Sequence, residues 1–296
     1  MTGATSGFGA HTARFLAEAP DTRVIVGARG TGRRVSPGVR VLPLELESLA
    51  SVRAFVASLI EELDGASIHL VLLNAGIRGA DAESLSADGF GRTFAVNHLS
   101  HHLLSRLLLP HLAEGARVVV TSSNMHDPPF RWMAPTGLDL EAWAHPSPGG
   151  SGTGMKAYCA SKLCNLMMAQ SLARLDTVKA RGIEVIAFNP GLTGGVGGTG
   201  ASVVQKALFW LLTHTLFAVV GLFRSEFVMN TPEHSGRMLA ELALGRLAVP
   251  GGRAYVSLVR GEPTFPDPSA LARDQQLQDR LWRESARMVG EPLQAS

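Results

Sequence analysis

Short apolar runs alternate with longer amphipathic stretches along this chain. The runs hold Val, Ile and Leu without strict alternation, as is typical of strands buried on both faces of a sheet. They are Arg23–Ala28, Arg40–Leu44, Ile68–Leu73, Arg117–Thr121, Ile183–Phe188 and Arg253–Leu258. Helices of crossover length are predicted between them, at Ser48–Leu63, Gly89–Leu112 and Lys156–Lys179. This alternation predicts an α/β fold, a doubly wound parallel sheet with helices on both faces. No repeat or low-complexity linker divides the chain, so we expect one domain over residues 1–296.

A glycine-rich turn opens the chain, and a helix-like stretch, Ala10–Ala19, follows it. Its glycines would let the backbone turn tightly and approach a pyrophosphate at the helix N-terminus. The residues of this turn expected to bind a dinucleotide are Gly3, Thr5, Ser6, Gly7, Phe8 and Gly9. A dinucleotide fold needs a strand that leads into such a turn, and only Met1 precedes it here. We therefore expect a truncated first strand, of which Met1 could be the last residue.

The residue that follows the run Arg23–Ala28 indicates which dinucleotide is bound. Arg29 follows the run Arg23–Ala28, and no Asp or Glu lies between Arg23 and Arg40. A carboxylate at this place would hold a ribose 2′-hydroxyl, whereas arginine suits a 2′-phosphate. The sequence thus favours NADP(H) over NAD(H). The alternative is that Arg29, with Arg33 and Arg34, belongs to a solvated loop.

Polar residues with catalytic potential stand at strand ends and on one helix. Tyr158 and Lys162 are spaced i, i+4, so they share a helix face, and the cation is expected to lower the pKa of the phenol. Ser123 follows the run Arg117–Thr121, where its hydroxyl could bond a substrate carbonyl. Asn74-Ala75-Gly76 closes another strand, and Asn97 lies within a predicted helix. Taken singly, Tyr158 could be an aromatic that packs the helix, Ser123 a helix cap and Asn97 a polar residue of a helix. Taken together, they indicate an active site.

These motifs together resemble those of the short-chain dehydrogenase/reductase family. The matching segments are TGxxxGxG (2–9), NAG (74–76), Asn97, SS (122–123), YxxSK (158–162) and NPG (189–191), and they span nearly the whole chain. The resemblance implies a Rossmann fold with a nicotinamide cofactor. The stretches AYCASKLCNLMMAQSL and LWRESARMVG are similar to the branch of retinol dehydrogenases, WW-domain oxidoreductases and light-dependent protochlorophyllide reductases.

The resemblance also implies roles for the catalytic residues. Tyr158 would be the general acid/base, and Lys162 would tune its pKa and bind the nicotinamide ribose. Ser123, rather than Ser122, would orient the substrate carbonyl, and Asn97 would organise a water-linked proton relay.

Further cofactor contacts follow from the same resemblance. Glu45 and the adjacent Leu46 stand where the family contacts adenine, although the family usually has an aspartate there. Pro190, Gly191 and Thr193 would lie at the nicotinamide. Leu192 replaces the cysteine that protochlorophyllide reductases carry after this Pro-Gly, which counts against a photoenzyme.

Composition and charge exclude several other classes. A chain that is 46% hydrophobic and 18% charged is too apolar to be disordered. Two cysteines exclude a disulfide scaffold and suit a reducing compartment, so a cytoplasmic location is expected. The net charge of +2, with scattered charges, gives no nucleic-acid footprint.

The mean hydropathy of +0.15 draws attention to one apolar segment, Ala207–Phe223. At 17 residues with His214 inside, it is short for a membrane span. We expect it to form part of a substrate cap over about residues 192–230, which implies a bulky hydrophobic substrate. Membrane contact is the less favoured alternative. No metal site is expected, because His98, His101 and His102 form an incomplete ligand set without an HExxH motif.

The sequence as a whole predicts an NADPH-dependent reductase that acts on a carbonyl of a hydrophobic small molecule. Two alternatives stay open: reduction of a conjugated C=C bond on the same scaffold, and a catalytically impaired, cofactor-binding regulatory protein. Whether the chain forms homo-oligomers is also left open.

Overall fold

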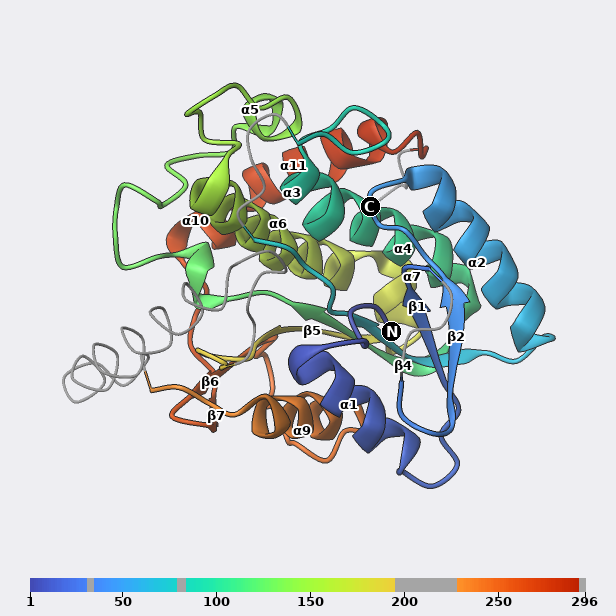
Figure 1. The fold of residues 1–296 in the computed structure, drawn as a ribbon. Coiled ribbons are helices and arrows are strands. Elements are labelled where there is room, and N and C mark those ends of the chain that lie inside the picture. Colours follow the sequence, from blue (N-terminus) through green and yellow to red (C-terminus); the bar gives the residue numbers. More distant parts are fainter. Residues whose placement is uncertain (31–34, 79–83, 195–227, 293–296) are drawn as a thin grey trace, which may run out of the picture.

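A mostly parallel β-sheet lies between two layers of helices in the computed structural model, which describes residues 1–30, 35–78, 84–194 and 228–292 (Figure 1). Strands β3 to β6 pair in parallel in chain order, β7 adds to β6 in antiparallel fashion, and β1 pairs with β2 in parallel. The strands are β1 (Val24–Ala28), β2 (Val39–Pro43), β3 (Ile68–Leu73), β4 (Leu112–Thr121), β5 (Glu184–Asn189), β6 (Tyr255–Val259) and β7 (Glu262–Thr264). The six strands predicted from the apolar runs are confirmed, and the short β7 was not predicted.

Met1 and Thr2 lie between β1 and β3, where the expected first strand would run. The carbonyl of Met1 accepts from the Gly27 amide at 3.0 Å, and the Thr2 amide donates to the Leu72 carbonyl at 3.0 Å. The Met1 ammonium donates to the Ile25 carbonyl at 2.9 Å. These two residues therefore connect the β1–β2 pair to the five-stranded sheet, in the place predicted for the end of the first strand. From Met1 and Thr2 the sheet continues through β1 to β2 on one side and through β3 to β7 on the other, which is the doubly wound strand order.

Both faces of the sheet are covered, and β4 shows why its residues are apolar throughout. Val118 and Val120 pack into the layer of α2, α4 and α6, while Val119 packs into the opposite layer of α1 and α9 (Figure 1). Side chains of a strand alternate between faces, so a strand with two covered faces needs apolar residues at each position. The helices that form these layers are α1 (Gly7–Ala17), α2 (Leu49–Leu63), α4 (Ser100–Leu108), α6 (Gly154–Arg174), α9 (Pro232–Ala243) and α11 (Gln275–Met288).

Two predicted helices differ in detail from the observed ones. The predicted Gly89–Leu112 helix is α3 (Arg92–Phe94), a π-helical turn η1 (Ala95–Leu99), α4 and a 3-10 turn η2 (Leu109–His111). The prediction of one helix over Lys156–Lys179 is wrong in part, because Leu175 takes φ −59 and ψ 134 and separates α6 from α7 (Asp176–Ala180). Shorter elements complete the described chain: η3 (Asn124–His126), α5 (Leu140–Ala144) and α10 (Ala270–Arg273).

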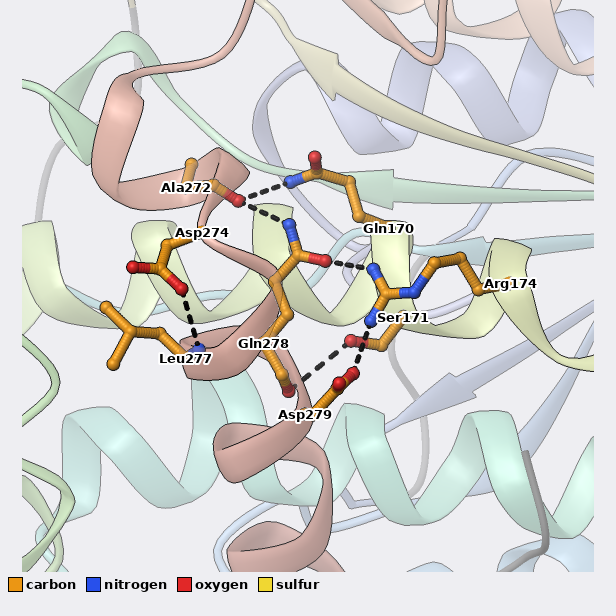
Figure 2. Close-up of polar contacts among 8 residues, drawn as sticks. All are labelled: Gln170, Ser171, Arg174, Ala272, Asp274, Leu277, Gln278 and Asp279. Carbon is orange, nitrogen blue, oxygen red and sulfur yellow. Dashed lines mark hydrogen bonds and ion pairs between the residues drawn. The ribbon is translucent and has the colours of Figure 1, made fainter.

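Helices α10 and α11 dock on the C-terminal half of α6, the helix that carries Tyr158 and Lys162 (Figure 2). Gln170 and the buried Gln278 both donate to the carbonyl of Ala272, at 2.9 and 2.6 Å. Arg174 pairs with Asp279 at 2.6 Å and also bonds the Gln278 side chain. The C-terminal helix thereby holds α6 from the side opposite the sheet.

The segment Ala207–Phe223 and most of the expected cap lie outside the described residues. Among the helices of the described ranges, none is both long enough and apolar enough to cross a membrane.

Candidate active site

The predicted site residues gather at one edge of the sheet, beyond the carboxyl ends of the parallel strands. Arg29 follows β1, Glu45 and Leu46 follow β2, and Asn74 follows β3. Ser123 lies just past β4, and Pro190 follows β5 directly. Open α/β sheets bind their ligands at this edge, so the topology assembles residues that are far apart in sequence.

The glycine turn packs directly against the Asn74-Ala75-Gly76 segment. Gly3 has φ +68, and a Cβ there would lie 2.7 Å from the Ala75 Cα; a Cβ on Gly9 would lie 2.0 Å from the Gly3 carbonyl oxygen. The Asn74 side chain donates to that same carbonyl at 3.1 Å and accepts from the Thr121 hydroxyl at 2.9 Å. Gly3 and Gly9 are therefore required by the packing of the turn itself.

Helix α1 begins at Gly7, directly after the turn, and its start is open to a ligand. Ser6, the N-cap, is exposed and makes no side-chain capping hydrogen bond. Thr5, Gly7 and Phe8 are partly exposed beside it. The first amides of a helix point along its axis and carry partial positive charge, so this end can receive a phosphate.

Asn97 is fully buried in the π-helical turn η1 and connects three parts of the site. Its Oδ1 accepts from the Ile77 amide at 2.7 Å, and its Nδ2 donates to the Ile77 carbonyl and to the Ser161 hydroxyl, both at 2.9 Å. Its own backbone carbonyl lies 3.0 Å from His101 Nδ1. Asn97 therefore fixes the segment after Gly76 against helix α6.

The two serines after β4 have different surroundings. The Ser122 hydroxyl donates to the backbone carbonyl of Lys162 at 2.9 Å, which ties β4 to α6. Ser123 caps η3 by accepting from the Met125 amide at 3.2 Å, and its hydroxyl donates to Asn124 Oδ1 at 3.2 Å. Its side chain also acts to lower the pKa of Tyr158. The geometry thus supports the choice of Ser123 over Ser122 as the serine that faces the reacting centre.

Tyr158 and Lys162 lie together on α6, as their spacing predicts, but their electrostatics differ from the expectation. Lys162 is 3% exposed, its Nζ donates to the Thr121 carbonyl at 3.0 Å, and burial lowers its pKa to about 8. Burial raises the pKa of Tyr158, whereas Arg78 and the Ser123 hydrogen bond oppose that rise. Arg78 is thus a second cation beside the phenol, and the expected effect of Lys162, whose Nζ lies 5.7 Å from the ring centroid, stays a prediction.

Arg78 is a site residue that the sequence motifs did not reveal. Its guanidinium carbon lies 5.5 Å from the centroid of the Tyr158 ring. The Lys162 Nζ lies 5.7 Å from the same centroid. The only available signal was a cation two residues after Asn74-Ala75-Gly76, which has no specificity by itself.

His101 and Thr2 form a second connection that the motifs did not reveal. Since the Asn97 carbonyl can only accept, Nδ1 of His101 carries the proton, and Nε2 accepts from the Thr2 hydroxyl at 3.0 Å. The Thr2 oxygen in turn accepts from the amides of Asn74 and Ala75, at 2.9 and 3.0 Å. This chain of bonds fixes the distance between the start of the glycine turn and η1.

The remaining histidines of this segment face elsewhere. The His98 Nε2 lies 2.8 Å from the Ser285 hydroxyl, and the His102 ring meets Trp282 edge-on at 4.6 Å, so both contact α11. In the described part of the chain, no group of His, Cys, Asp or Glu is arranged to hold a metal ion.

The residues expected at the adenine and the nicotinamide lie at the same sheet edge. Leu46 is buried and its carbonyl accepts from the Ser100 hydroxyl at 2.5 Å, while Glu45 is partly exposed. Gly191 has φ +68. The Thr193 hydroxyl bonds the Pro190 carbonyl at 3.1 Å and Ser235 at 3.0 Å, which turns it toward α9.

Comparisons with known proteins show which family the chain is similar to. A family model for the short chain dehydrogenase matches residues 1–135. The mouse polyprenol dehydrogenase is 33% identical over 311 residues, with 98% of this chain and 83% of that protein covered. The human retinol dehydrogenase 13 is 30% identical, with the same coverage of both chains. The crystal structure of an uncharacterised protein from Mycobacterium paratuberculosis superposes with a TM-score of 0.68 at 28% identity, over 99% of this chain and 93% of that one.

Proposed function

This chain belongs to the short-chain dehydrogenase family of oxidoreductases, and on that premise we propose that it interconverts a carbonyl and an alcohol of a bulky hydrophobic substrate with NADP(H) as cofactor. The observation that carries the proposal is the position of Tyr158, with Lys162 Nζ 5.7 Å from its ring centroid and Ser123 close enough to act on its pKa. An impaired, regulatory protein would not need Ser123 and Lys162 arranged around Tyr158.

The residues around the turn fit a dinucleotide. Helix α1 offers its first amides at Ser6 and Gly7 to a pyrophosphate, and the side chains of Thr5 and Phe8 flank that end. A Cβ on Gly76 would come within 3.3 Å of Asn97 Oδ1 and 3.5 Å of Lys162 Nζ. The absence of a side chain at Gly76 leaves room for a ribose against these two groups.

The remaining contacts would lie along the sheet edge. Arg29 would pair with a 2′-phosphate, since no carboxylate lies between Arg23 and Arg40 to take a 2′-hydroxyl. Glu45 and Leu46 would border the adenine. Pro190, Gly191 and Thr193 would border the nicotinamide.

Each catalytic side chain would then have one task. When bound, the reduced nicotinamide supplies the hydride that reaches the carbonyl carbon. The Ser123 hydroxyl orients the carbonyl oxygen, and Tyr158 gives its phenolic proton to that oxygen, so the product is the alcohol. Lys162, held by the Thr121 carbonyl, binds the ribose and faces the phenol. In the reverse direction the Tyr158 phenolate removes the proton from the alcohol.

A lipophilic substrate is supported by two observations. The two curated relatives are named for polyprenol and retinol, both lipophilic alcohols. In this chain, Phe130 and Trp132, in the segment between Ser123 and Tyr158, are 56% and 67% exposed. Exposed aromatics in the part of the chain between Ser123 and Tyr158 suit contact with an apolar molecule.

The replacement Tyr158→Phe tests the proposal. It should lower the rate of NADPH oxidation with apolar aldehydes and ketones by about 100-fold or more, because the proton donor is lost. The dissociation constant for NADPH should stay within about threefold of the unmodified chain's, since the ring is kept. Tyr255→Phe, which changes the other tyrosine of the chain, is the matched control and should keep full activity. Substantial turnover by Tyr158→Phe would contradict the proposed role, and activity on enones alone would favour C=C reduction instead.

A further inference from the structure

Two cations lie near the ring of Tyr158. Lys162 approaches it from the next turn of the same helix, and Arg78 approaches it from the segment after β3. The two distances to the ring centroid are nearly equal, 5.7 Å for the ammonium and 5.5 Å for the guanidinium. Only the first cation is accounted for in the proposed function.

Arg78 is placed there by the fold. The Asn97 side chain holds the amide and the carbonyl of Ile77, the residue immediately before it. Asn97 also bonds Ser161, one residue before Lys162. One buried amide thus sets the position of Arg78 relative to the helix that carries Tyr158.

We propose that Arg78 is a positioning residue for the reaction, a second cation that stabilises the Tyr158 phenolate and makes the site competent to oxidise alcohols nearer to neutral pH. The proposal rests on the proposed function in one respect: it takes Tyr158 as the acid/base group.

The division of labour between the two cations follows from their surroundings. Lys162 is buried, and burial together with Arg78 lowers the pKa of its ammonium to about 8, so its charge is lost as the pH rises through about 8. A guanidinium keeps its proton at any pH at which the protein is folded. The guanidinium of Arg78 therefore supplies a fixed positive charge beside the phenol.

The other groups around Tyr158 do not supply this charge. Ser123, from the end of β4, contributes a neutral hydrogen bond, and Cys159, next in α6, opposes ionisation. The His126 Nδ1 bonds the backbone carbonyl of Ser123 at 2.7 Å, and its Nε2 accepts from the Ser269 amide at 3.4 Å. Burial raises the pKa of the phenol, and the coulombic attraction of Arg78 is the largest influence in the opposite direction.

The consequence for catalysis depends on direction. Alcohol oxidation needs the phenolate, so its rate below the pKa of Tyr158 scales with the ionised fraction. Loss of the Arg78 charge should raise this pKa by about 0.5 to 1 unit, as expected for a partly solvated charge about 6 Å away. Oxidation at low pH should then slow about three- to tenfold, while carbonyl reduction, which uses the protonated phenol, should change by less than about twofold.

The composition of the chain allows a direct test, because it contains only two tyrosines. In a Tyr255→Phe background, Tyr158 is the sole tyrosine, and its ionisation can be followed by tyrosinate ultraviolet absorbance without any turnover. Arg78→Gln should raise the pKa of Tyr158 as predicted above, and Arg78→Lys should raise it by less than half as much. Arg131→Gln, which removes another exposed arginine of the described chain, should show none.

A second measurement needs no change at Arg78. Raising the salt concentration should move the titration of Tyr158 in the same direction as Arg78→Gln, since an exposed cation is screened. The proposal would be overturned if Tyr158 had the same pKa in Arg78→Gln and in Arg131→Gln and if that pKa did not respond to salt. Absence of any dehydrogenase activity in the unmodified chain would instead refute the proposed function, while the absorbance titration would still decide the role of Arg78.

Discussion

The side chain of Asn97 holds both backbone polar groups of Ile77, with an N–H to Oδ1 bond of 2.7 Å and an Nδ2 to carbonyl bond of 2.9 Å. Such a two-point contact fixes the path of the chain after Gly76, the segment that borders the candidate ribose site. It also depends on the π-helical turn η1, because this turn displaces Asn97 from a regular helical position.

Asn97→Ala should therefore damage both stability and activity. Three hydrogen bonds of a fully buried amide are lost, and we expect the free energy of unfolding to fall by about 2 to 4 kcal/mol. The affinity for NADPH should fall about tenfold or more, because Ile77 and Gly76 are no longer held. Urea unfolding and fluorescence titration would measure the two effects. Unchanged NADPH affinity would show that Asn97 serves the fold alone.

The replacement Gly9→Ala tests whether the glycine turn tolerates a side chain. In Gly9→Ala the new Cβ would lie 2.0 Å from the Gly3 carbonyl oxygen and 2.7 Å from Asn74 Nδ2, so the turn must open. We expect a loss of several kcal/mol of unfolding free energy and of NADPH binding. Gly137→Ala is the control, since a Cβ there meets nothing within 4 Å. Tight NADPH binding by Gly9→Ala would show that the turn can adapt.

The fold, and the placement of Tyr158 and Lys162 on one helix face, could be predicted from the sequence for a physical reason. Strands with two covered faces must be apolar throughout, so runs such as the one that includes Val118–Val120 are visible without other information. Motif spacing likewise brings Tyr158 and Lys162 to one helix face. The position of Met1 at the end of a central strand was also among the expectations.

The side-chain contacts that the sequence did not predict join residues that lie far apart in the chain. Thr2 meets His101 across 99 positions, and no periodicity connects them. Arg78 reaches Tyr158 only because a buried amide on another element holds its neighbour. The docking of α11 on α6 likewise depends on individual pairs such as Arg174–Asp279, which no local pattern encodes. Residue types and spacing predict the candidate reacting groups, whereas tertiary contacts decide which charges lie beside them.

Arg29 should set the preference between the two nicotinamide dinucleotides. Arg29→Asp replaces the expected 2′-phosphate ligand with a group that suits a 2′-hydroxyl, so we expect the affinity for NADPH to fall about tenfold or more and that for NADH to rise. Dissociation constants for both, measured by fluorescence, would test this. Arg131→Asp makes the same charge change at another exposed position and should leave the ratio unaltered. An unaltered ratio in Arg29→Asp would show that Arg29 belongs to a solvated loop.

Three buried histidines should make the fold sensitive to acid. Burial lowers the pKa of His98 to about 3 and that of His101 to about 4, and it places the pKa of His102 well below its usual value. The unfolded chain takes up protons near pH 6.5 while the folded chain does not. The contribution of these histidines to the free energy of unfolding should thus be fully present above about pH 7 and be lost as the pH falls below 6.5.

His101→Gln isolates one of these protons. The amide keeps polar atoms near Thr2 and Asn97 but does not titrate, so the dependence of unfolding free energy on pH between 6.5 and 4 should weaken by up to about 1.4 kcal/mol per pH unit. Urea unfolding at a series of pH values would measure the slope. His69→Gln is the control, because it makes the same replacement at an exposed position. If His101→Gln and the unmodified chain lose stability with the same slope, His101 is protonated in the folded protein, and its bond to Thr2 then has the opposite polarity.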